Sequence, residues 1–202
     1  MYLNRLNIFR PMPQYGASLI EVMITIFILG FGLLGVAMIQ DRIHLLNQES
    51  YQRGQALVLA NDMAERINAN RDNAASYSYL SSLSPTYLGV GDAQPSSCTA
   101  LTGAARDVCE WSALLKGSAQ SIGGNALATV AAARGCITQI QAANSTAGAC
   151  QAGIYQIDVV WQGRSALFSP PTSVTCGKDL YPSEYYRRWI STRIGVGVPT
   201  CG

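Results

Sequence analysis

One carboxylate and six cysteines are the residues of this sequence whose type and position could do chemistry. The carboxylate is Glu21, the single ionisable group in the apolar run from Ala17 to Ile39. A charge in such a run is costly unless it meets an opposite charge, and the run itself contains no Lys or Arg. Cleavage after Gly16 would create an α-amino group at Ala17 that could supply the positive charge.

The apolar run from Ala17 to Ile39 is long enough to cross a membrane. As a helix it measures about 35 Å, against a hydrocarbon core of about 30 Å. It is too long for a cleaved secretory signal, and a buried helix of this length would need a larger protein around it. Arg5 and Arg10 precede it without an acid, which favours a cytoplasmic amino terminus. A plain anchor leaves Glu21 unexplained unless its carboxylate snorkels to the lipid surface.

A family resemblance accounts for that acid. The segment Gly16-Ala17-Ser18-Leu19-Ile20-Glu21-Val22 resembles the processing and methylation motif of type IV pilins and pseudopilins. The resemblance implies that prepilin peptidase cleaves after Gly16 and methylates Ala17, and that Glu21 neutralises the terminal amine of a neighbouring subunit. Ala17 departs from the Phe that is commoner at the first mature position.

Periodicity and the resemblance together predict an α+β, pilin-like fold: one long amino-terminal helix on a small antiparallel sheet with disulfide-stapled loops. No Pro interrupts 17–69, and an amphipathic stripe continues beyond the apolar run. Its members are Ile39, Ile43, Leu46, Ser50, Arg53, Leu57, Ala60, Ala64 and Ile67. The expected regions are a cleaved leader (1–16), a membrane or filament-core half-helix (17–39), an amphipathic half-helix (40–69) and a periplasmic head (70–202).

Within the head, alternation of apolar and polar residues predicts three strands. These are Cys136–Gln141, Tyr155–Trp161 and Arg188–Val196. The Ala-, Ser- and Gly-rich stretch before them is expected to hold a short helix, Val108–Ser118, and a turn at Gly123-Gly124-Asn125.

The six cysteines all follow the apolar run, which predicts three disulfides in an oxidising compartment. Six cysteines allow 15 pairings, and we favour the sequential one because each loop so closed contains Gly, Ser or Pro. A zinc site is disfavoured because the sequence has no C-x-x-C pair and only one His. The favoured pairs are Cys98 with Cys109, Cys136 with Cys150, and Cys176 with Cys201.

No catalytic or nucleotide-binding motif is present, so no enzyme activity, cofactor or metal is expected. His44, the one histidine, is expected to be a partly buried structural residue. A net charge of +2 gives no nucleic-acid footprint. Arg187 and Arg188 stand beside tyrosines, as in a nucleic-acid-binding or adhesive surface, but a solvated strand edge explains them better.

The head is loosely similar to PilV-type minor pilins in Cys136-Ile137, in Val159-Val160-Trp161 and in the strand from Arg188 to Arg193. This resemblance implies a minor pilin that initiates pilus assembly at the tip and can carry an adhesin. It also implies as partners other minor pilins, the major pilin, prepilin peptidase and the inner-membrane assembly platform. The head would be periplasmic before assembly and on the cell-surface pilus afterwards.

Two alternatives remain open from the sequence alone. A minor pseudopilin of type II secretion shares the processing motif. A membrane-anchored, disulfide-stapled adhesin that never polymerises would keep its leader, and its activity would not depend on Glu21.

Overall fold

The computed structural model describes residues 16–81, 86–117, 121–122, 125–126, 130–146 and 150–198. The chain divides into two compact units, Met1–His44 and Leu45–Gly202. We call the second unit the head.

The long helix, α1, runs from Leu19 to Ala69, which confirms the predicted continuous helix. Its buried residues begin only at Ala56, and Leu57 remains 43% exposed. The prediction that the stripe faces the head is therefore right for Ala60, Ala64 and Ile67. It is wrong for the six members that precede Ala60, all of which are exposed. The face that packs in the head carries mainly small side chains, which let neighbouring elements approach the helix axis closely. The buried residues are Ala56, Ala60, Met63, Ala64 and Ile67.

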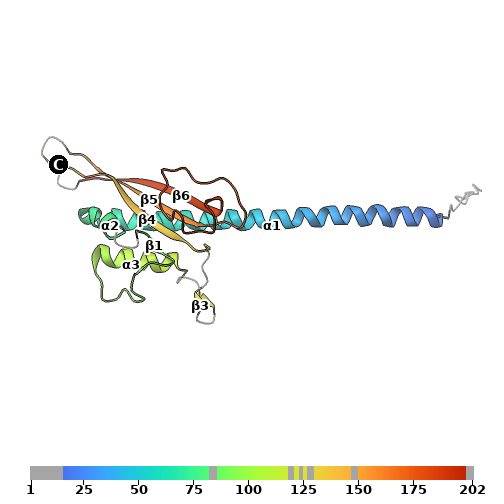
Figure 1. Ribbon diagram of the computed structural model, residues 1–202, viewed down its shortest axis with the longest axis horizontal. Helices are drawn as coiled ribbons and strands as arrows, with labels where there is room; N and C mark the ends of the chain where they lie inside the picture. Colours follow the sequence, from blue (N-terminus) through green and yellow to red (C-terminus); the bar gives the residue numbers. More distant parts are fainter. Residues whose placement is uncertain are drawn as a thin grey trace, which may run out of the picture. The chain divides into compact units, whose positions relative to one another are not determined.

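A four-stranded antiparallel sheet has the order β1-β4-β5-β6. Figure 1 shows β4, β5 and β6 beside the carboxyl-terminal part of α1. All three predicted strands are confirmed, and each is longer than predicted by one to three residues. The bounds of the sheet strands are Leu88–Gly89 for β1, Arg134–Gln141 for β4, Gly153–Gln162 for β5 and Arg187–Val196 for β6.

Two further strands, β2 (Ser121–Ile122) and β3 (Asn125–Ala126), pair only with each other. Gly123 and Gly124 of the predicted turn lie outside the described residues.

The central strand β5 is covered on both faces. Alternate residues Tyr155, Ile157, Val159 and Trp161 are buried in the main core together with residues of α1. On the opposite face, Val160 is fully buried against Cys176 and Tyr181 of the β5–β6 connection. A strand covered twice loses the strict burial alternation of a half-exposed strand. The β5–β6 connection is therefore part of the fold rather than a free loop.

The remaining helices belong to the head, and Figure 1 shows α2 and α3 beside α1 and the sheet. They are η1 (Arg71–Asn73), α2 (Ala74–Ser81) and α3 (Gly103–Leu115), with η2 (Glu184–Tyr186) just before β6. The helix predicted at Val108–Ser118 thus begins five residues earlier and ends three residues earlier.

Trp111 fixes α3 to α1. Its side chain is fully buried, and its indole N–H donates to the carbonyl oxygen of Leu59 at 2.8 Å. On β4, Gly135 makes room for this ring, because a Cβ there would collide with Trp111. The Trp111 ring, and the lack of a Cβ at Gly135, therefore set how closely α3 approaches the sheet.

Candidate functional site

The segment that resembles a processing motif lies at the start of α1. Gly16, Ala17 and Ser18 are exposed and non-helical, and the helix begins at Leu19. The Ser18 carbonyl accepts hydrogen bonds from the Glu21 and Val22 amides at 3.0 and 3.2 Å. The bond between Gly16 and Ala17 therefore lies just outside the helix, where a peptidase can reach an extended backbone.

Glu21 lies in the first turn of α1, and no Lys or Arg within the described residues pairs with its carboxylate. A negative charge in the first turn is favoured by the helix dipole, by about 0.3–1 kcal/mol. This is small beside the cost of a lone charge in an apolar environment. The dipole therefore does not remove the need for a positive partner.

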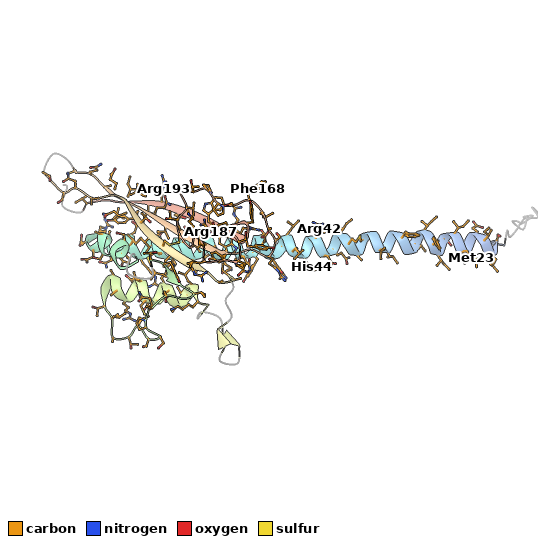
Figure 2. The ribbon with its side chains drawn as sticks, in the orientation of Figure 1. Met23, Arg42, His44, Phe168, Arg187 and Arg193 are labelled. Atoms are coloured by element: carbon orange, nitrogen blue, oxygen red, sulfur yellow. A yellow bond between two sulfur atoms is a disulfide. The ribbon has the colours of Figure 1, made fainter. Side chains whose placement is uncertain are left out.

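The apolar half of α1 is uncovered. Large side chains from Leu19 to Ile39 are between 47% and 74% exposed, and Figure 2 shows side chains projecting from both edges of α1 between Met23 and Arg42. Within the described residues, α1 is the one helix long and apolar enough to cross a membrane. Its single polar hydroxyl at this depth, on Thr25, donates to the Val22 carbonyl at 2.8 Å. This surface requires lipid or other helices around it.

The disulfides confirm one predicted pair and overturn the others. Cys98 bonds to Cys109, as predicted. Cys136 on β4 bonds to Cys176 in the β5–β6 connection, so the pairs Cys136 with Cys150 and Cys176 with Cys201 are wrong. The reason is topological, because β4 and the β5–β6 connection meet across β5 although 40 positions separate them. Cys150 is also disulfide-bonded, and Cys201 lies outside the described residues.

The two neighbouring arginines of β6 do not form the basic surface patch that their sequence position suggests. They point to opposite faces of the strand. Arg187 is 2% exposed and binds Glu184 at 2.5 Å and the Val174 and Cys176 carbonyls at 3.0 and 2.9 Å. The cluster is therefore neither a nucleic-acid surface nor a solvated edge. Arg187 instead holds the β5–β6 connection on the sheet.

A second charged cluster joins α1, α2 and α3. Arg66 binds Asp62 and Glu110 at 2.9 Å and Asp107 at 3.3 Å. The Tyr77 hydroxyl donates to Asp107 at 2.5 Å. Burial and this hydrogen bond raise the pKa of Tyr77 to about 12. A tyrosine that remains protonated and a paired arginine form a structural cluster rather than a catalytic one.

Neither a metal centre nor a catalytic histidine emerges from the described part of the chain. It contains no group of three or more His, Cys, Asp or Glu placed to hold a metal. His44 is exposed on α1, so the expectation of a partly buried histidine is wrong. It lies where α1 has no buried face.

The head also carries a groove that sequence reasoning did not single out. Leu46, Leu167 and Trp189 line an open hollow of about 650 Å³ together with Glu49, Arg53 and Arg188. Phe168, next to Leu167, is 90% exposed. The available signal was the apolar triplet Ala166-Leu167-Phe168 inside a segment otherwise rich in Ser and Pro.

Comparison with known proteins yields two family matches. Residues 11–37 match the prokaryotic N-terminal methylation motif. Residues 43–109 match the type IV pilin Tt1218 family. No curated protein and no solved structure gives a significant match.

The fold and the amino-terminal segment thus define a class of membrane-associated protein, in which a methylation motif opens a long helix that continues into a disulfide-bonded α+β head. Both matches point to the type IV pilin family, to which residues 11–37 and 43–109 of this chain are similar. Members of this family are structural subunits that associate with membranes and with other pilins.

Proposed function

We propose that this chain is a minor pilin of a type IV pilus, which helps to initiate assembly at the pilus tip and can present an adhesin there. The observation that carries the proposal is the uncovered apolar half of α1, with one acid in its first turn and a non-helical Gly16–Ala17 bond before it. The action is assembly through this helix, not catalysis.

Processing and assembly follow from the same three residues. Prepilin peptidase cleaves after Gly16 and methylates the new amino group of Ala17. That amino group, on one subunit, pairs with the Glu21 carboxylate of another subunit in the filament core. In a medium of low dielectric constant such a pair is strongly favoured over two separate charges. The charge pair therefore stabilises the axial stagger of neighbouring helices at which these two groups meet.

The change of environment explains the all-round apolar surface of α1. Before assembly the segment from Leu19 to Ile39 spans the inner membrane, with the head in the periplasm. After assembly the same surface packs against the helices of other pilins. Gly30, Gly32 and Gly35 have nothing within 4 Å of where a Cβ would lie, so close helix packing has room at these positions.

The features of the head favour a minor subunit. The disulfides Cys98–Cys109 and Cys136–Cys176 lie in separate parts of the head, and Cys150 is bonded as well. Oxidised cysteines in the head support a periplasmic or extracellular location. A major pilin commonly has a smaller head with one disulfide loop, so this arrangement supports the minor role.

Mass spectrometry of the protein isolated from its own membranes tests the processing step. We expect a chain that starts at Ala17 and carries one added methyl group. A chain that still contains Met1 would refute the pilin proposal and favour the non-polymerising adhesin.

Complementation of a deletion strain tests assembly and separates pilus from secretion. Glu21→Gln should leave the protein in the membrane but remove it from sheared pili, whereas Asp41→Asn, an exposed acid of the same helix, should not. The deletion itself should reduce surface pili. Loss of secreted enzymes with normal pili would instead identify a type II secretion pseudopilin.

A further inference from the structure

An exposed apolar surface lies at the edge of the groove described above. Leu46, Leu167 and Trp189, which are 66%, 51% and 37% exposed, line the groove, and Phe168, which is 90% exposed, follows Leu167 in the chain. We call these four residues the Phe168 patch. Figure 2 shows Phe168 on the connection between β5 and β6. Large apolar side chains gathered in this way mark a contact surface rather than ordinary surface scatter.

Hydrogen bonds fix the backbone that leads to Phe168. The Leu167 amide donates to the Tyr185 carbonyl at 2.9 Å, and the Gly163 amide donates to the Tyr186 carbonyl at 2.7 Å. Arg188 holds the Ser165 carbonyl at 2.7 Å. The backbone before Phe168 is therefore fixed to the strand side of the head, and the ring is presented to the exterior.

The sequence limits how far the patch can be from the membrane. Leu46 follows Ile39, the end of the apolar run, by seven positions. Seven residues span about 10 Å as a helix and about 25 Å at full extension. Leu46 therefore stays within about 25 Å of the membrane boundary for any orientation of the head, and Leu167 shares its groove.

The charged side chains beside the patch that have no acidic partner are arginines. Arg53 lines the groove and is exposed, and Arg164 is exposed and donates to Gln48. The one acid of the groove, Glu49, is already paired with Arg188 at 2.8 Å. Aromatic and arginine side chains together are typical of protein surfaces that lie at the headgroup level of a membrane.

We propose that, before assembly, the Phe168 patch rests on the phospholipid surface of the membrane that anchors the chain. Leu167 and Phe168 enter the boundary between headgroups and acyl chains, and Arg53 and Arg164 contact anionic headgroups. The contact restricts the tilt of the head on its anchor and must be released when the subunit enters the filament. This inference rests on the proposed membrane anchoring of α1.

Quenching of tryptophan fluorescence by brominated acyl chains tests the contact in the full-length protein. The vesicles contain phosphatidylethanolamine with a minor fraction of phosphatidylglycerol. Phe168→Trp reports on the patch, and Phe27→Trp reports on the anchor. Ile140→Trp is the matched control, because Ile140 is 50% exposed on β4 and does not line this groove. Emission added by each variant is compared with that of the unsubstituted chain.

We expect bromination to quench the added emission of Phe27→Trp and Phe168→Trp and to leave that of Ile140→Trp unchanged. Quenching of Phe27→Trp alone would overturn the patch proposal and leave the anchor intact. Absence of quenching at Phe27→Trp would refute the anchoring itself. If the Phe168→Trp emission depends on protein-to-lipid ratio but not on bromination, a second copy covers the patch and the proposal is wrong.

The arginines provide a second test. Omission of phosphatidylglycerol should reduce the quenching of Phe168→Trp, and the added changes Arg53→Gln and Arg164→Gln should abolish that dependence. Equal quenching with and without the anionic lipid would overturn the assigned role of the arginines.

Discussion

Arg188 on β6 donates two hydrogen bonds to Glu49 Oε1 on α1, from Nη2 at 2.8 Å and from Nε at 3.1 Å. The two side chains are only 13% and 22% exposed, and they join parts of the chain 139 positions apart. The pair fixes the start of the last strand to the helix at a point before the helix acquires a buried face. Glu49 is the first residue along α1 that is partly buried.

Replacement of Arg188 by Gln should destabilise the head by about 1–3 kcal/mol, because it leaves a half-buried carboxylate without its charged partner. Glu49→Gln should cost a similar amount, and the double variant should cost less than the sum. Chemical denaturation measures each change. Glu65→Gln, at an exposed acid of the same helix, is the control and should have little effect. Additive losses would show that the two residues act independently.

Stability in acid should depend on Asp92. Burial alone would raise the pKa of Asp92, but hydrogen bonds from Lys116, Ser112 and the Gly89 and Gln94 amides outweigh it and hold the pKa below its usual range. The stabilisation is therefore complete above the ordinary pKa of about 3.9 and is lost as the pH falls through the lower folded-state pKa.

Unfolding titrations from neutral pH to below pH ~3.9 test this expectation. Asp92→Asn should be less stable at neutral pH and should lose less additional stability on acidification than the unsubstituted protein. Asp72→Asn, which changes an exposed acid, should retain the full acid dependence. An identical acid slope in Asp92→Asn would refute the assignment.

Removal of the two described disulfides should have unequal effects. Each is expected to stabilise the head by about 2–4 kcal/mol. The Cys136–Cys176 bond spans 40 positions and the Cys98–Cys109 bond spans 11, so loop-closure entropy makes the first worth about 1 kcal/mol more. Denaturation of the two Cys-to-Ser double variants measures the difference. A larger loss for the shorter loop would show that native-state packing dominates.

The third disulfide should join Cys150 to Cys201. Cys150 is disulfide-bonded, and the other four cysteines already pair with each other. Gly153 and Val196 pair where β5 begins and β6 ends. In the sequence Cys150 precedes Gly153 by three positions and Cys201 follows Val196 by five. Non-reducing peptide mapping should recover this pair from the monomer. A disulfide-linked dimer through Cys150 would contradict the prediction.

The sequence predicted the elements that depend on local periodicity. The alternation of Tyr155, Ile157 and Val159 revealed β5, and the Pro-free stretch after Ala17 revealed α1. The motif around Gly16 pointed to the same family as the methylation-motif and pilin matches.

Features that depend on tertiary contacts were not predictable in the same way. The bond from Cys136 to Cys176 requires knowledge that the β5–β6 connection folds back over β5. Leu57 was wrongly assigned to the buried face of α1 because it is large and apolar. The small residues Ala56 and Ala60 are buried in the core instead. From the sequence Arg187 is expected to be a surface charge, yet it is buried. Glu184 and the carbonyls of Val174 and Cys176 compensate this burial.

The anchoring of the β5–β6 connection has a consequence for how this protein can diversify. The two ends of the connection are held by contacts that do not involve the residues at its tip. These contacts are the hydrogen bond of the Gly163 amide at one end, and Arg187 and the Cys136–Cys176 bond at the other. The exposed residues from Ser169 to Ser173, apart from the buried Pro170, can therefore change in composition while the sheet keeps its register. Substitutions there can give the protein a new surface without a change of its fold.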